Sequence, residues 1–148
     1  MTRTASSRAA TTENLGFLLA KASQRLNERL VERLAARGFG EVRASYGSVL
    51  VPLFERDGLR LGELAGAARL SKQAMTGLVK RCEDDGLVAR ERDPGDGRAF
   101  NVRLTDRGRA LHAVAEDVLR ELDDELVRSL GKRNHDALAR ALKGVMEL

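Results

Sequence analysis

A strong turn signal between two short β-prone runs constrains the fold more than any other feature of this chain. The turn is Asp-Pro-Gly-Asp-Gly-Arg at 93–98, and the runs are 87–92 and 100–104. Proline fixes φ near about −65° and glycine accepts positive φ, so Pro-Gly and Asp-Gly pairs mark tight turns. The pattern predicts a β-hairpin. Arginines at positions 90, 92, 98 and 103 would make this hairpin a basic finger.

Helices are expected over most of the remaining chain, because apolar residues recur there at helical spacing. The predicted helices run from a cap at Thr12 to the glycines at 38 and 40, over about 42–54, over 61–68, from a cap at Ser71 to about 84–86, from a cap at Thr105 to Gly131, and over 134–148. Pro52 is expected to kink the second helix or tighten its last turn.

The helix that begins at Ser71 has two contrasting faces. Met75, Leu78, Val79 and Cys82 fall at i, i+3, i+4 and i+7 and predict the buried stripe. The outer face would carry Lys72, Gln73, Thr76, Gly77, Lys80 and Arg81. Gln and Thr hydrogen-bond base edges, Lys and Arg contact guanine or phosphate, and Gly permits close approach to a DNA groove. An ordinary amphipathic surface helix would show the same pattern.

The neighbours of this helix favour the DNA-reading interpretation. A short helix, a turn, a capped helix and a basic hairpin in this order predict a winged helix-turn-helix lobe over 41–104. With the capped helix in the major groove, the hairpin reaches the flanking minor groove, whose negative potential attracts arginine. We expect DNA contacts from Ser71, Arg90, Arg92 and Arg98. Asp96, or Asp93 beside it, would hold the Arg98 guanidinium in position.

The terminal segments 12–40 and 105–148 are predicted to be dimerisation helices. Their apolar stripes are too extensive for a lobe of about 70 residues to cover, whereas two copies would bury them in a large interface. The alternative is a monomeric bundle. The expected fold is mainly α with a small β-hairpin wing, a winged helix-turn-helix with N- and C-terminal dimerisation helices. A two-fold dimer would hold its reading helices about 34 Å apart and predicts a pseudo-palindromic operator in double-stranded DNA.

The composition limits which other classes of protein this chain can belong to. A chain of 148 residues that is 43% hydrophobic can form one domain with a real core, and a net charge of +4 weakly favours a polyanionic partner. No apolar run approaches the length of about 20 residues needed to cross a bilayer. Residues 1–11 are expected to be disordered and lack the hydrophobic segment of a secretory signal. We therefore expect a cytoplasmic location.

Few residues suggest other chemistry. The single cysteine, Cys82, is a candidate redox sensor, but its predicted burial beside the acidic residues 83–85 favours a core role. His112 and Glu116 stand at i, i+4 and could share a metal; we interpret them, and the run 123–125, as solvated helix faces. No nucleophile constellation, phosphate loop or carboxylate pair is present, so neither enzyme activity nor a cofactor or metal is expected.

Several motifs resemble those of the MarR family (multiple-antibiotic-resistance regulators). They are Leu-Gly-Glu-Leu-Ala at 61–65, the segment 71–90, the turn 93–98, and Leu-Thr-Asp-Arg-Gly-Arg-Ala-Leu at 104–111. The resemblance implies a winged-helix repressor or activator that is an obligate homodimer. It also implies that the first and last helices build the interface and that small anionic or phenolic ligands relieve DNA binding. It maps the start of the recognition helix onto Ser71 and the minor-groove arginine onto Arg98.

An effector cleft is expected between the dimerisation helices and the DNA-binding lobe, lined by the first two helices and the start of the long one. Phe17 and Tyr46 are candidate aromatic walls and Arg43 a candidate partner for a carboxylate, although Tyr46 suits a core position equally well. We therefore predict a ligand-responsive homodimeric repressor that binds double-stranded DNA sequence-specifically. The alternatives are a winged-helix protein-interaction module and a non-specific architectural DNA-binding protein.

Overall fold

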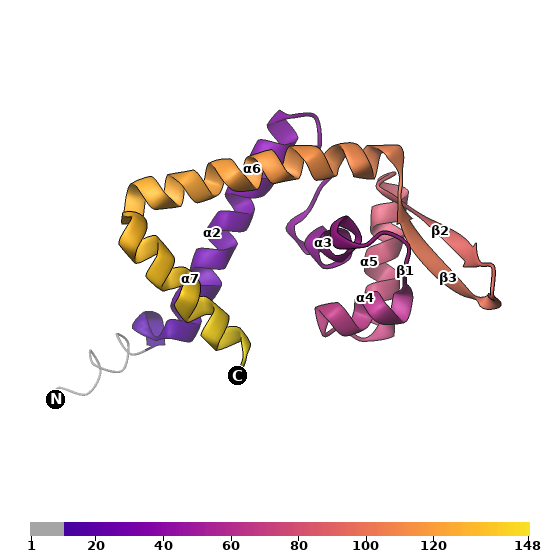
Figure 1. Cartoon of the computed structure of the whole chain (residues 1–148), viewed down its shortest axis with the longest axis horizontal. Coiled ribbons are helices and arrows are strands. Elements are labelled where there is room, and N and C mark those ends of the chain that lie inside the picture. Colours follow the sequence, from indigo (N-terminus) through magenta and orange to yellow (C-terminus); the bar gives the residue numbers. More distant parts are fainter. Residues whose placement is uncertain (1–10) are drawn as a thin grey trace.

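The computed structural model describes residues 11–148, which are mainly helical with a small antiparallel sheet, as predicted. The helices are α2 (Leu15–Ala36), α3 (Gly47–Glu55), α4 (Leu61–Ala68), α5 (Lys72–Asp84), α6 (Asp106–Leu130) and α7 (Lys132–Met146), with a 3₁₀ turn at Ala44–Tyr46. The strands are β1 (Leu59–Arg60), β2 (Val88–Asp93) and β3 (Asp96–Leu104). In Figure 1, α3, α4, α5 and the sheet form a lobe at one end of α6, α7 turns back from the other end of α6, and α2 crosses α6 outside the lobe.

The predicted caps of α5 and α6 are confirmed. The Ser71 hydroxyl accepts from the Ala74 amide at 3.1 Å, and the Thr105 hydroxyl accepts from the Gly108 amide at 3.1 Å. Gly131 ends α6 with a positive φ of 81°. The two hydroxyls satisfy amides that a helix start leaves unpaired and so fix where α5 and α6 begin, whereas the positive φ of Gly131 ends α6.

Two helix boundaries were predicted wrongly. Asn14, not Thr12, caps α2, because its side chain accepts from the Phe17 amide at 3.0 Å. The single helix expected over 42–54 is instead a 3₁₀ turn followed by α3, which continues through Pro52 and ends three residues later. The predicted disorder of residues 1–11 lies outside the described residues except at Thr11, which is helical.

The sheet has one strand more than predicted. Its order is β1-β3-β2, with Val88 opposite Leu104 and Arg92 opposite Phe100 in the hairpin of residues 88–104, here called the wing. β3 begins at Asp96, so the turn is shorter than expected. β1 pairs Leu59 with Val102 and Arg60 with Asn101. Two residues carry no alternation, so β1 could not be recognised in the sequence.

The core joins the lobe to the start of α6. Leu53, Leu64, Met75, Leu87 and Leu111 are among its largest fully buried side chains. Gly108 allows the closest approach, since a Cβ there would lie 2.2 Å from the Leu87 carbonyl oxygen. The glycine of the Leu-Thr-Asp-Arg-Gly-Arg motif therefore lets α6 start directly against the beginning of β2.

Ion pairs hold α2 along α6. Arg29 Nη2 lies 2.9 Å from Glu125 Oε2, Arg33 also binds Glu125, and Arg37 binds Glu121. Farther along α6, Asp123 Oδ1 lies 2.7 Å from Nε2 of His135 on α7. The prediction that the run 123–125 is a solvated surface is confirmed for Asp123, whose side chain is 60% exposed, whereas Glu125 is half-buried where it binds Arg29 and Arg33.

Much of the apolar surface of the terminal helices is uncovered in the single chain. α7 is amphipathic yet buries none of its residues. Leu138 and Val145 on α7 are each 45% exposed, and Leu15 on α2 is 75% exposed. Exposed leucines clustered on terminal helices are typical of a surface that another chain covers.

Candidate nucleic-acid interface

The predicted division of α5 into a buried and a polar face is confirmed. Met75, Leu78, Val79 and Cys82 are all buried. The predicted DNA contacts Ser71, Lys72, Gln73, Thr76, Gly77, Lys80 and Arg81 are all exposed. A Cβ added at Gly77 would meet no neighbouring atom of residues 11–148 within 4 Å, so packing inside the chain does not explain this mid-helix glycine.

The wing separates its charges by strand alternation. Cross-strand partners share a face, and the pairs Arg90–Val102 and Arg92–Phe100 lie on one side of the hairpin. Together with Arg98 these residues form the inner face of the wing. The carboxylates of the Arg-Glu-Arg-Asp run, Glu91 and Asp93, fall on the opposite, outer face. The side nearer α5 is therefore lined by arginines without carboxylates from the same strand.

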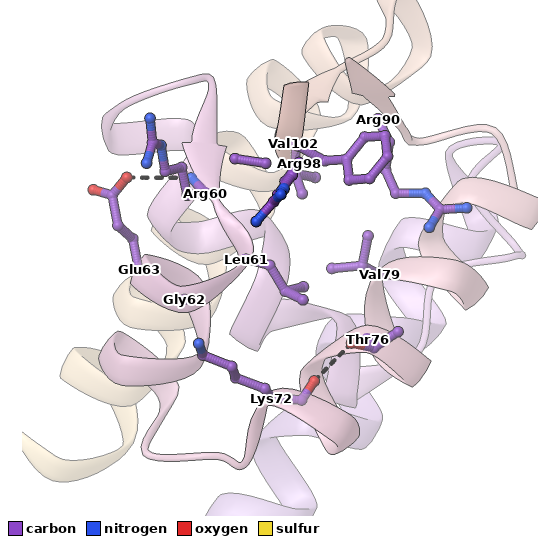
Figure 2. A pocket seen from close by; sticks show the side chains of 12 residues that line it. Arg60, Leu61, Gly62, Glu63, Lys72, Thr76, Val79, Arg90, Arg98 and Val102 are labelled. Atoms are coloured by element: carbon purple, nitrogen blue, oxygen red, sulfur yellow. Dashed lines mark hydrogen bonds between the residues drawn. The ribbon is translucent and has the colours of Figure 1, made fainter. Parts of the chain in front are cut away.

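The inner face borders a cleft of about 400 Å³ between the wing, the start of α4 and α5. Leu61, Val79 and Val102 form part of its apolar wall. Figure 2 shows Arg98 pointing from the wing toward Leu61, with Lys72 across the cleft beside Gly62. The hydrophobic wall supports the wing against the helices, and cations surround its opening.

Some of these cations are already paired. Lys80 Nζ lies 2.6 Å from Asp84 Oδ1, and this contact raises the lysine's pKa. Arg90 binds Glu83 through both Nε and Nη2, at 3.2 and 3.1 Å. No carboxylate of residues 11–148 forms an ion pair with Lys72, Arg81, Arg92 or Arg98. These four side chains are the ones available to phosphate without first breaking an internal contact.

Arg98 is not held as predicted. Asp96 accepts from the backbone amide of Arg98 at 3.0 Å, and its carboxylate forms no ion pair with the guanidinium. Asp93 accepts from the Gly95 amide and from the Arg60 guanidinium. Both carboxylates are so short that nearby backbone N–H groups satisfy them first, which is the usual behaviour of Asp in turns.

A second cavity, of about 170 Å³, lies where the effector cleft was predicted, between α2, the 3₁₀ turn, α3 and the start of α6. Its walls are largely apolar, and Arg43, His112 and Glu116 are its charged or titratable lining residues. Of the three candidates, only Arg43 lines it. The sequence-based choice of the other two is therefore wrong for this cavity.

Tyr46 and Phe17 lie elsewhere for clear reasons. Tyr46 is 2% exposed, and its hydroxyl donates to Asp85. Burial, followed by this hydrogen bond, raises the pKa of Tyr46 to about 12. Phe17 lies about three and a half turns of α2 before Leu30, where the cavity begins, with Lys21 Nζ 5.8 Å from its ring centre.

Sequence reasoning missed two residues of the cavity. The ring of Phe54 stacks on that of His112, with centroids 4.3 Å apart and planes 4° from parallel. His112 is thus half-buried, and its predicted assignment to a solvated face is wrong. Its Nε2 lies 3.1 Å from Glu116 Oε1. The i, i+3, i+4, i+7 spacing of His112, Ala115, Glu116 and Leu119, all lining the cavity, was the available signal.

Known proteins resemble this chain in sequence and in fold. The model of the MarR family matches residues 44–100, from the 3₁₀ turn into β3. The Mycobacterium tuberculosis MarR family protein Rv2887, in its complex with salicylic acid, is 31% identical. The likeness covers 89% of this chain and 96% of that one, with a TM-score of 0.65. The chain belongs to the MarR family.

One further relative, CouR, and the sequence comparison with Rv2887 itself agree with this assignment to the MarR family. The transcriptional repressor CouR, bound to a 23-mer DNA duplex, has a TM-score of 0.78 and 29% identity over 93% of this chain and 95% of CouR. The HTH-type transcriptional repressor Rv2887 of Mycobacterium tuberculosis (strain H37Rv) is 40% identical over 78 residues, 53% of this chain and 56% of the repressor. The matched segment thus spans about half the length of that curated relative.

The single cysteine of this MarR family chain, Cys82, is a buried thiol. Burial, then the charge of Asp85, raises the pKa of the Cys82 thiol to about 12, consistent with the predicted core role. Between residues 11 and 148, no three His, Cys, Asp or Glu side chains gather where they could hold a metal ion. No helix in the same range has an apolar stretch long enough to cross a membrane.

Proposed function

We propose that this chain is a sequence-specific transcriptional regulator that binds double-stranded DNA as a homodimer and releases it in response to a small effector. One observation carries the proposal: the polar face of α5 and the arginine-lined inner face of the wing border the same cleft. The relatives support it, since CouR is described as a repressor bound to a DNA duplex. The proposal implies a cytoplasmic location.

DNA recognition would divide between the two elements. α5 enters the major groove, where Gln73 and Thr76 reach base edges and Lys80 does so after exchanging Asp84 for an acceptor on DNA. Thr76 must likewise release the Lys72 carbonyl, to which its hydroxyl donates at 2.7 Å. Phosphate contacts by Lys72 and Arg92 set the register, and Arg98 reads the minor groove.

Dimerisation would cover the exposed apolar faces of the terminal segments 12–40 and 105–148. α7, which buries nothing in one chain, would pack against the partner's terminal helices. The lobe 41–104 of each subunit would remain free to bind one half-site. A two-fold axis then holds the two α5 helices one DNA turn apart, about 34 Å.

The effector would occupy the 170 Å³ cavity. Engineered apolar cavities of about 150 Å³ hold a benzene ring, so the size suits a single aromatic ring. Arg43, which has no ion-pair partner among residues 11–148, would bind an anionic group on that ring. Rv2887 has been solved with salicylic acid, a molecule of this class. The cavity lies between the lobe and α6. An effector that binds more tightly when the lobe is displaced therefore shifts the protein toward a conformation that does not bind DNA.

Selection from a random-sequence duplex library tests the DNA-binding proposal. We expect enrichment of a pseudo-palindrome whose half-sites are about one helical turn apart, and a complex that survives excess unrelated DNA. Binding without an enriched sequence would instead favour the non-specific architectural protein. No binding at low salt would favour the protein-interaction module.

Solution mass and ligand titration test the other two parts. A monomer mass at micromolar concentration would contradict the homodimer. Salicylate is the probe for the cavity, and we expect it to raise the melting temperature of the wild type but not of Arg43→Ala. An equal rise in both proteins would show that the anion binds elsewhere.

A further inference from the structure

An ion pair crosses the sheet near the tip of the wing. Arg60 in β1 and Asp93 in β2 belong to the two outer strands, yet Arg60 Nη2 lies 2.5 Å from Asp93 Oδ2, across the central strand β3. The Asp93 side chain is only 14% exposed. The contact therefore joins the end of β2 to a strand that is not its neighbour.

At the wing end, Asp93 also fixes the turn. Its Oδ1 accepts from the Gly95 amide at 2.8 Å. This hydrogen bond and the Arg60 guanidinium hold the pKa of Asp93 below its usual range, so the carboxylate is ionised at neutral pH. One side chain thus links the shape of the turn to the position of Arg60.

At the other end, Arg60 is anchored to the helix-turn-helix. It directly precedes α4, and its backbone amide donates to Glu63 Oε1 at 3.2 Å, as Figure 2 shows. Glu63 also binds Arg56, at the end of α3. The chain of contacts therefore runs from the helices that support α5 out to the turn of the wing.

The wing depends on this link because its backbone pairing with β1 stops at Asn101. Beyond that residue the hairpin has only its own two strands, and an isolated two-stranded hairpin is marginally stable in water. Arg98 lies in this projecting part. The Arg60–Asp93 pair is the contact between that part and the anchored strand β1.

We propose that Arg60 and Asp93 are positioning residues that set the angle of the wing relative to α5 and so deliver Arg98 to the DNA. This inference rests on the DNA-binding function proposed above. It assigns a role to a carboxylate that otherwise makes little sense beside a polyanion. The positioning role also predicts that neutralising this carboxylate weakens DNA binding, whereas simple electrostatics predicts that it strengthens DNA binding.

Replacing Asp93→Asn removes one negative charge from the DNA-binding lobe while leaving an oxygen to accept from Gly95. Electrostatics alone predicts tighter DNA binding, because repulsion of phosphate is reduced. The positioning role predicts weaker binding, by about fivefold if each of the two pairs in the dimer contributes near the middle of the usual range for a surface ion pair.

The experiment measures duplex affinity by fluorescence anisotropy at one salt concentration, with a duplex selected by the wild-type protein. Glu91→Gln is the matched control: it makes the same charge change on the same face, but Glu91 binds Arg103 of the adjacent strand. We expect Asp93→Asn and Arg60→Gln to bind about fivefold more weakly, Glu91→Gln to bind no more weakly than wild type, and Arg60→Lys to retain most of the affinity. Melting temperature and dimer mass should be unchanged.

A double variant completes the test. Arg60→Gln with Asp93→Asn should bind no more weakly than the weaker single variant, because both remove the same link. Asp93→Asn binding as tightly as wild type or more tightly, while Arg98→Ala is weakened, would overturn the positioning role and leave the DNA-binding function intact. An unaffected Arg98→Ala would instead refute the wing contact itself, and the positioning role with it.

Discussion

Replacing Gly108→Ala should strongly destabilise the protein. The added Cβ would lie 2.2 Å from the Leu87 carbonyl oxygen, a backbone atom that cannot rotate away. Relief requires α6 to shift by about 1 Å, which strains the amide of Thr105, a donor to the same oxygen at 3.1 Å. Overpacking of this kind costs about 3 kcal/mol at the upper end of its range. The better helix propensity of alanine offsets about 1 kcal/mol, leaving about 2 kcal/mol.

For a chain of this length, that loss corresponds to a melting temperature lower by about 4–8 °C. Circular dichroism at fixed protein concentration is the assay, since the stability of a dimer depends on concentration. Gly66→Ala in α4 is the matched control, because a Cβ added there would have no neighbour within 4 Å among the described residues. It should stabilise the protein by about 0.5–1 kcal/mol. A Gly108→Ala protein as stable as wild type would refute the close approach of α6 to β2.

Three further outcomes are expected. Gly77→Ala should raise the melting temperature slightly, by the helix propensity of alanine, yet weaken DNA binding; unchanged affinity would mean that this part of α5 stays clear of the groove. Cys82 should react with a thiol reagent at about pH 8 only after unfolding, because its pKa is about 12; rapid labelling of the folded protein would contradict its burial. His135 contacts carboxylates with both ring nitrogens, Asp123 at 2.7 Å and Asp136 at 3.1 Å, and these bonds raise its pKa. Its stabilising contribution is therefore complete below about pH 6.5 and is lost as the pH rises through the raised pKa, so the stability difference between wild type and His135→Gln should shrink as the pH rises above about 6.5. A difference independent of pH would contradict the charged state of the ring.

The features that could be predicted from the sequence depend on contacts between residues close in the chain. The Ser71 and Thr105 caps bond amides three residues away, and the buried stripe of α5 follows from helical periodicity alone. The wing was found because Pro94 and Gly95 dictate a turn wherever they occur. The polar face of α5 and the arginines of the wing followed from the same local rules.

The features that could not be predicted depend on residues far apart in the chain. Arg60 and Asp93 are 33 residues apart, and β1 exists only because β3 passes beside it. The Phe54–His112 stack forms where α3 meets α6; helical periodicity can place His112 on the cavity side of α6, but it does not identify Phe54 as the partner. The sequence allows the Asp96 carboxylate to accept either from the Arg98 guanidinium, as predicted, or from the Arg98 backbone amide. In the folded turn it accepts from the amide.

The central claim is that α5 and the inner face of the wing bind DNA together. The most direct test is the affinity of the selected duplex over a salt series, for the wild type and Arg98→Ala. The account predicts that the logarithm of the wild-type affinity falls steeply and linearly with the logarithm of salt concentration. Arg98→Ala should bind more weakly, with an unchanged dimer mass and a slope shallower by about 2, because the dimer carries two copies of Arg98. Affinity that is independent of salt, or identical for the two proteins, would contradict it.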